Sequence, residues 1–392
     1  LYNSVQFQDA YWGSGEVVKD NERIEVFKVD IADEHSLSMD WHSFMKNLSE
    51  VMSSFDWKQH QHFLNTFKQY RTEIEGLPIH FLRISLPKES TKDTVPLLML
   101  HGFPGSYWDF FKVIPILTNP VRFGFDFGVR RPLLFEVIVP SLPGFIFSGK
   151  PSKRGFSTTD MARIMAKLMQ RLSVKSYFIQ GSELLGTEIA AVMGGLYPTR
   201  VRGVHLSNPI IHPHSFPQVF FNSFQLMDFR ELKSSKLKTP CRRNTSNRQR
   251  LRHLYMMTSG DALSSSPLGT SSYLMSVWSS FSSRDRSVLL NRLFTLDELA
   301  TISYLYYLTE STPHAMRIML MFLNEDLLQI RVPCGILQSP AVPWSTPNSI
   351  ARHRFLNITS FTTVPKGGAF LHLQEPQNFA ADVFRFVERV MM

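Results

Sequence analysis

Apolar and polar positions along the chain repeat with two different periods, and together these periods predict strands separated by helices. Short runs that are apolar almost throughout, such as residues 95–100 and 135–139, are typical of parallel strands buried on both faces. Segments with apolar residues three and four positions apart, such as residues 158–172, are typical of helices that cover a sheet. The alternation of the two patterns therefore predicts an α/β fold with a mostly parallel sheet.

The same patterns place the other elements. Further strands are predicted at residues 79–86, 174–180, 201–206, 334–338 and 360–364, and further helices at residues 55–70, 187–196, 345–354 and 376–390. This rhythm stops between about residues 208 and 310, where helical segments rich in Phe, Ser and Met take over. The sheet is therefore expected to be interrupted by a helical insertion.

Composition excludes several classes of protein. The 392 residues are 43% hydrophobic and 19% charged, which is typical of a folded globular protein. Two cysteines cannot make a disulfide framework, and no apolar run approaches the roughly 18 residues of a membrane span, so the chain as given is expected to be soluble. The net charge of +9 is concentrated in residues 232–260, which contain no Asp or Glu. We interpret that stretch as a solvated loop and expect no nucleic-acid partner.

Candidate chemistry follows the ends of three predicted strands, where open parallel sheets place their active sites. Residues 101–106 read HGFPGS, and their glycines suit an oxyanion hole, with Phe103 as the candidate residue. Residues 181–186 read GSELLG at a predicted strand-to-helix turn, the position of a nucleophile in hydrolases. Ser182 fails the pattern G-x-S-x-G and Leu184 has no reactive group, which leaves Glu183.

Motifs along nearly the whole chain resemble the microsomal and juvenile-hormone type of epoxide hydrolase. They are WGSG at 12–15, IEVFKVDIAD at 24–33, FDWK at 55–58, HGFPGS at 101–106, PSLPGF at 140–145, SSSPLG at 264–269 and FTLDEL at 294–299. The resemblance implies an α/β-hydrolase fold, a mostly parallel sheet covered by helices. It also implies an N-terminal meander at 1–90, a catalytic core at 91–208 and 326–392, and a helical lid at 209–325.

In that family a carboxylate attacks the epoxide and forms an ester, which a histidine-activated water then hydrolyses, while lid tyrosines bind the epoxide oxygen. The resemblance implies a small hydrophobic or lipid-like epoxide as the substrate, xenobiotic detoxification as a role, and no cofactor or metal. It implies an endoplasmic-reticulum or microsomal location, with membrane association only through a segment absent from this chain.

Several catalytic positions of the family carry other residues here. Gly181 and Gly186 of the elbow are five positions apart, one more than the family pattern permits, so Glu183 is a displaced candidate nucleophile. Ala369 stands at the position of the base, and His372 is a displaced substitute that is expected to need a rebuilt loop to reach the nucleophile.

The acid and one lid tyrosine are also replaced. Val342 stands at the position of the acid, and residues 327–374 contain no Asp or Glu. Met319 occupies the position of a lid tyrosine. The sequence therefore predicts an epoxide hydrolase that is weak or inactive, because groups that act as a unit are disturbed together. The alternatives are a pseudoenzyme that binds a hydrophobic ligand, or a degenerate product that folds poorly.

Overall fold

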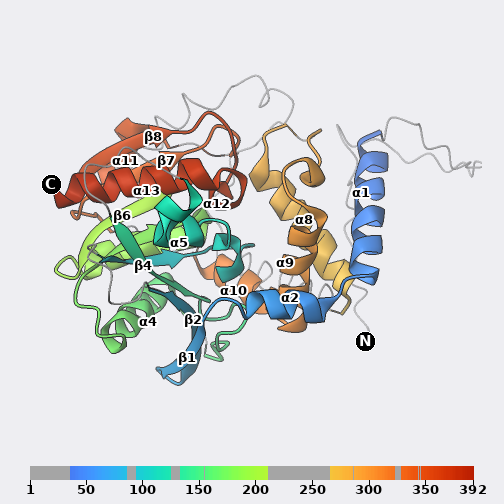
Figure 1. The fold of residues 1–392 in the computed structure, drawn as a ribbon, viewed down its shortest axis with the longest axis horizontal. Helices are drawn as coiled ribbons and strands as arrows, with labels where there is room; N and C mark the ends of the chain where they lie inside the picture. Colours follow the sequence, from blue (N-terminus) through green and yellow to red (C-terminus); the bar gives the residue numbers. More distant parts are fainter. Residues whose placement is uncertain are drawn as a thin grey trace, which may run out of the picture.

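The computed structural model describes residues 36–85, 94–124, 133–153, 155–210, 265–285, 287–322, 328–342, 344 and 346–392, without the side chains of 36–42 and 320–322. Its centre is an eight-stranded sheet in the order β1-β2-β4-β3-β5-β6-β7-β8 (Figure 1). The strands are β1 (Gln69–Ile74), β2 (Leu77–Ile84), β3 (Thr94–Leu100), β4 (Leu134–Pro140), β5 (Tyr177–Gly181), β6 (Val201–Ser207), β7 (Cys334–Gln338) and β8 (Ile358–Thr363). β1 and β2 join as antiparallel strands, and the pairings from β4 to β8 are all parallel.

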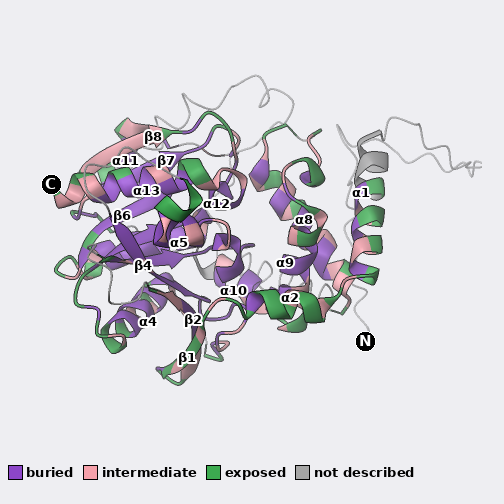
Figure 2. Cartoon of the chain, in the orientation of Figure 1, coloured by how far each residue is buried: buried purple, intermediate pink, exposed green. Residues whose placement is uncertain are grey.

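Helices cover both faces of the sheet. On one face α5 (Glu183–Leu196) packs against β3, β5 and β6, and α4 (Thr158–Arg171) packs beside it. On the other face α13 (Pro376–Met391) packs against β6, β7 and β8, next to α3 (Ile114–Thr118). The remaining short elements are η1 (Tyr107–Phe110), η2 (Pro120–Phe123), η5 (Leu290–Arg292), α11 (Asn348–Arg354) and α12 (Leu371–Gln374). The strands between these layers are largely buried (Figure 2).

A separate helical layer stands beside the sheet, on the right in Figure 1. It contains α8 (Pro267–Ser282), α9 (Leu296–Leu308), and the N-terminal helices α1 (Ser36–Ser53) and α2 (Trp57–Leu64), while α10 (Thr312–Phe322) follows α9 in the chain. Tyr304 of α9 joins the two parts of this layer, since its hydroxyl donates to the Met52 carbonyl over 2.7 Å and its ring stacks on Phe55. The N-terminal segment is therefore packed against the insertion.

The predicted sheet is confirmed. Residues 97–99, 137–139, 178–180 and 336–338 all lie in it, with β6 between β5 and β7. The predicted helix at 55–70 is wrong at its end: α2 stops at Leu64 and β1 begins at Gln69. Pairing of β1 with β2 overrides the helical pattern there.

Some expectations fall outside this description. The basic stretch at 232–260 and the first part of the predicted lid lie outside the described residues. The four regional boundaries remain predictions. Among the described helices, none combines the length and the apolar character needed to cross a membrane.

Candidate active site

The turn between β5 and α5 holds Glu183 in a strained conformation. Glu183 has φ 50°, in the left-handed region, directly after Ser182 in an extended conformation. The Ser182 N–H donates to the Leu100 carbonyl of β3 over 2.9 Å, which ties the turn to the neighbouring strand. A non-glycine residue at positive φ costs roughly 1–3 kcal/mol and is a frequent feature of functional sites. The sheet therefore presents the Glu183 side chain at its carboxyl edge.

Two glycines make this turn possible despite their spacing. A Cβ atom on Gly181 would lie 2.5 Å from the Gly186 carbonyl oxygen, and one on Gly186 would lie 2.7 Å from the His101 carbonyl oxygen. Neither position can therefore hold a larger residue. Leu185, which occupies the additional position between them, is fully buried. The turn thus accommodates four residues between its two glycines, and Gly186 allows the close approach to the end of β3.

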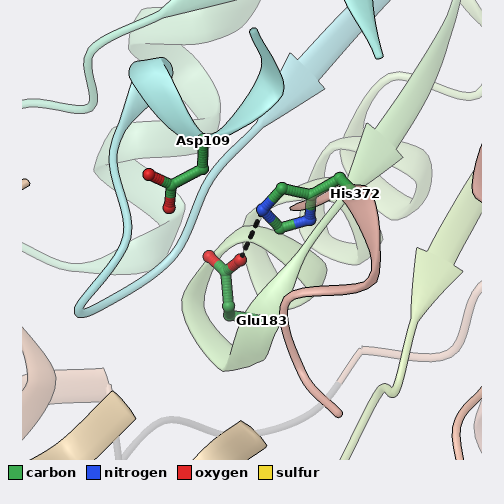
Figure 3. Close-up of side chains that lie close together, drawn as sticks. All are labelled: Asp109, Glu183 and His372. Carbon is green, nitrogen blue, oxygen red and sulfur yellow. Dashed lines mark ion pairs between the residues drawn. The ribbon is translucent and has the colours of Figure 1, made fainter. Parts of the chain in front are cut away.

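The two carboxylate oxygens of Glu183 have different surroundings (Figure 3). Oε2 accepts a hydrogen bond from the Gly102 backbone N–H. Oε1 has no hydrogen-bond partner among the described residues and lies 3.4 Å from His372 Nε2. The side chain is completely buried. One oxygen is therefore fixed by the loop after β3, and the other faces the imidazole with a free lone pair.

His372 lies in α12, and its imidazole lies beside the turn that carries Glu183. Its ring is fully buried and lies 4.7 Å, centroid to centroid, from the Phe110 ring. Neither ring nitrogen has a hydrogen-bond partner among the described residues. Burial lowers the pKa of His372 to about 3, so the imidazole is neutral at neutral pH and can accept a proton.

Asp109 is a further member of the cluster that the sequence patterns did not reveal. It lies in η1, and its carboxylate comes close to both Glu183 and His372 (Figure 3); one ligand atom from each residue lies within 4.8 Å of the others. Asp109 Oδ2 accepts from the Ser106 N–H over 3.0 Å, as half of a capping box. The signal in the sequence was Ser-x-x-Asp directly after HGFPG, which marks a helix start.

The two buried carboxyl groups change each other's protonation. Burial raises the pKa of Asp109 to about 8 and raises the pKa of Glu183 well above its usual value; in Glu183 the charge of Asp109 adds to the effect and the Gly102 hydrogen bond opposes it. Two carboxylates close together in a dry environment do not both ionise. The pair therefore retains at least one proton at neutral pH.

The other sequence candidates lie near the cluster but contribute no reactive group. The Phe103 ring packs near Tyr273 and Tyr306, and the N–H that meets the Glu183 carboxylate belongs to Gly102 instead. Ala369 and Val342 are buried in the loops after β8 and β7. Both residues make polar contacts through their own backbone atoms: the Ala369 N–H donates to the Phe281 carbonyl, and the Val342 carbonyl accepts from the Arg284 side chain.

Met319 is half-buried in α10 and supplies no hydroxyl.

The cluster also has the ligand types of a metal site. Asp109, Glu183 and His372 offer two carboxylate oxygens and an imidazole nitrogen. Ligand atoms on a tetrahedral zinc ion lie about 3.4 Å apart, given bonds of about 2.1 Å. The three ligand atoms lie within 4.8 Å of one another, and Glu183 Oε1 and His372 Nε2 are 3.4 Å apart.

Comparison with known proteins identifies relatives over the whole chain. Residues 21–110 match the family model described as the epoxide hydrolase N terminus, and residues 95–376 match that of the α/β hydrolase fold. Epoxide hydrolase 1 of Oryctolagus cuniculus is 31% identical, over 98% of this chain and 93% of its own length. Juvenile hormone epoxide hydrolase 1 of Ctenocephalides felis is 28% identical, over 97% and 89%.

Solved structures agree with these relatives. The crystal structure of the juvenile hormone epoxide hydrolase of Bombyx mori is similar, with a TM-score of 0.71 and 25% identity over 93% of both chains. The Aspergillus niger epoxide hydrolase is similar with a TM-score of 0.68 and 25% identity, over 93% of this chain and 91% of the other.

Proposed function

This chain belongs to the epoxide hydrolase family of α/β-hydrolases, and from that premise we propose that it converts a small hydrophobic epoxide and water to a diol, with Glu183 as the nucleophile and His372 as the base. The observation that carries the proposal is the contact of 3.4 Å between Glu183 Oε1 and His372 Nε2 in a fully buried cluster. The imidazole reaches the ester-forming atom from a position three residues beyond Ala369.

The first step uses the free oxygen of Glu183. Oε1 attacks an epoxide carbon, the carbon–oxygen bond of the ring breaks, and a glutamyl ester forms with an alkoxide on the neighbouring carbon. The Gly102 N–H holds Oε2 and fixes the carboxylate during the attack. This orientation reduces the entropic part of the barrier, because the reacting atoms start in place.

The second step hydrolyses the ester. His372 Nε2 takes a proton from a water molecule, and the hydroxide attacks the carbonyl carbon of the ester. The Gly102 N–H then faces the oxyanion that develops on Oε2, as a donor of an oxyanion hole does. The oxygen of the water enters the Glu183 carboxylate, and the diol leaves with the original oxygen of that carboxylate.

Turnover is expected to be slow. Burial favours the neutral form of Glu183, and a protonated carboxyl group is a poor nucleophile. This same observation favours a second candidate function, the binding of a hydrophobic epoxide without turnover. An endoplasmic-reticulum location and a role in detoxification are parts of the proposal that rest on the family resemblance alone.

A single-turnover experiment tests the proposal. The protein, in molar excess, is mixed with styrene oxide in H₂¹⁸O. Intact-mass spectrometry follows the ester, and chromatography follows the diol. We expect an ester in the native protein, ¹⁸O in Glu183 after hydrolysis, and no ester in Glu183→Gln. His372→Gln is expected to accumulate ester without diol, and His62→Gln, on the exposed side of α2, serves as the control. Saturable binding without ester in the native protein would establish the binding function instead.

A further inference from the structure

The reaction proposed above releases an alkoxide and leaves it without a proton donor, and we propose that the carboxyl group of Asp109 is that donor. The inference rests on the proposed function and assigns to Asp109 a catalytic role. It is carried by the placement of Asp109 beside Glu183 and His372, where it forms the third corner of a fully buried triangle (Figure 3).

The position of Asp109 is fixed by its own local structure. Asp109 Oδ2 accepts from the Ser106 N–H over 3.0 Å, and Ser106 Oγ approaches Oδ1 only to 3.4 Å. One oxygen is therefore held firmly, and the other makes a weak contact at the limit of hydrogen bonding. Gly105 lies between the two acids: a Cβ atom there would contact Asp109 Oδ2 and lie 3.0 Å from Glu183 Oε2. Only a glycine allows the carboxyl groups to approach each other in this way.

Tyr306, the buried tyrosine near the cluster, is less suited to the role. Its hydroxyl donates to the Gly105 carbonyl over 2.7 Å, so its proton is already engaged. Burial, with the charges of Asp109 and Glu183, raises the pKa of Tyr306 well above its usual value. Tyr306 therefore supports the loop that carries Gly105. Tyr273 of α8 packs near Phe103 and is close enough to act on the pKa of Tyr306, so it is the rival donor that the experiment below includes.

The charged and titratable groups around Asp109 come from three helices and from Lys112, which follows η1. Glu183 lies at the start of α5, His372 in α12, and Tyr306 and Glu298 in α9. Lys112 forms an ion pair with Glu298 over 2.5 Å and reduces the effect of that charge. Burial, the largest effect, together with Glu298 raises the pKa of Asp109 to about 8. Asp109 is accordingly a neutral acid at physiological pH and ionises in the range where a general acid is effective.

The proton balance closes over one cycle. Glu183 Oε1 attacks the epoxide carbon while the Asp109 carboxyl proton passes to the released oxygen, which becomes the first hydroxyl of the diol. Asp109 is then a carboxylate. Water loses a proton to His372 as it attacks the ester, the collapsing intermediate expels the second diol oxygen, and the imidazolium proton supplies that oxygen. The second proton of that water remains on the regenerated Glu183 carboxyl group, and its transfer to Asp109 restores an ionised Glu183 and a neutral Asp109 for the next cycle.

Asp109→Asn separates this role from a structural one, because the amide oxygen still accepts from the Ser106 N–H. We expect the rate of ester formation to fall by about 10²- to 10⁴-fold, with a smaller loss for p-nitrostyrene oxide, whose released oxygen needs less protonation. The native rate should fall above a pH of about 8, and Asp109→Asn should lose this decline. Asp160→Asn is the matched control, since Asp160 forms the same capping box with Ser157 in α4.

The outcomes separate the two proposals. No ester in the native protein would refute the function, whereas an ester formed at the native rate and with the native pH profile in Asp109→Asn would refute only the role of Asp109. A large loss in Tyr306→Phe or in Tyr273→Phe, with little loss in Asp109→Asn, would assign the proton to that tyrosine. If Asp109→Asn does not fold, the pH profile and the p-nitrostyrene oxide comparison in the native protein still decide, because a rate that stays level from pH 7 to 9.5 excludes Asp109 as the donor.

Discussion

Replacing Asp109 by Asn is expected to make the protein more stable at alkaline pH, because the native carboxyl group opposes folding there. The pKa of Asp109 rises from 3.8 to about 8 on folding, mainly through burial. A raised pKa means that the folded state binds the proton more tightly than the unfolded state. Binding of this proton therefore stabilises the folded state relative to the unfolded state. This contribution of Asp109 is complete below pH 3.8 and is lost as the pH rises through about 8.

The size of the effect follows from these values. Each pKa unit corresponds to about 1.4 kcal/mol, and pH 7 lies about three units above 3.8, so Asp109 costs up to about 4 kcal/mol at that pH. Asparagine removes this cost and keeps the acceptor for Ser106, but its buried NH₂ group lacks a partner, at about 1–3 kcal/mol. The net gain expected at pH 7 is therefore about 1–3 kcal/mol. It should grow as the pH rises toward 8, and at pH 4 the substitution is expected to be destabilising.

Urea unfolding between pH 4.5 and 8.5 measures this difference. The free energies of unfolding of the native protein and Asp109→Asn should cross, with the native protein showing the steeper decline toward high pH. Asp160→Asn should behave in the opposite way. Although burial raises the pKa of Asp160, its hydrogen bonds with Ser157 and Arg163 lower that pKa overall, so Asp160 stabilises the fold at neutral pH. Parallel pH curves for the native protein and Asp109→Asn would refute the reasoning.

Four further outcomes are expected. Gly186→Ala should largely prevent folding, because its Cβ would press on rigid backbone carbonyls at the end of β3 and in the loop that follows. Gly195→Ala, also in α5, should be tolerated in thermal unfolding, because its Cβ would meet the end of the flexible Ile330 side chain and lie at ordinary contact distance from Leu328. Arg354→Leu should cost about 3–5 kcal/mol by leaving Glu188 buried and unpaired, and adding Glu188→Leu should recover much of it in urea unfolding. Dialysis against EDTA should leave ester formation unchanged, which a metal-dependent reaction would not permit. Ala369→His should give no gain in diol, since its site is fully buried and His372 already lies 3.4 Å from Glu183; an appreciable gain would contradict the proposal that His372 is the base.

The sheet could be predicted from the sequence because its strands are apolar over several consecutive residues. Strands of this kind are buried on both faces, and their pattern does not depend on distant contacts. The end of α2 could not be predicted in the same way. Residues 65–70 continue a helical spacing, but pairing of β1 with β2 decides their conformation, and such pairing is invisible in a local pattern.

The cluster was harder to predict because its residues are brought together only by folding. Counting positions from the family pattern identified Glu183 and His372, yet it also suggested that both were misplaced. A left-handed turn at Glu183 and the placement of α12 close the gap to 3.4 Å, and neither effect follows from spacing. Asp109 escaped notice because its capping box accounts for its presence by ordinary helix chemistry. A residue with an adequate local role gives no sign of a second one.

Stability measurements distinguish these two roles of Asp109 more directly than activity does. If the capping box were its whole purpose, Asp109 would behave like Asp160, and replacement would destabilise the protein at neutral pH. Its burial beside Glu183 predicts the reverse, a residue that lowers stability where the enzyme would work. The strained φ of Glu183 acts in the same direction. Costs of this kind, grouped in one buried cluster, are expected where groups are arranged for reaction instead of for packing. An increase in stability together with a loss of ester formation in Asp109→Asn would therefore mark the cluster as an active site. A decrease in stability together with a loss of ester formation would show that Asp109 acts as a helix cap, with activity lost because the fold is weakened.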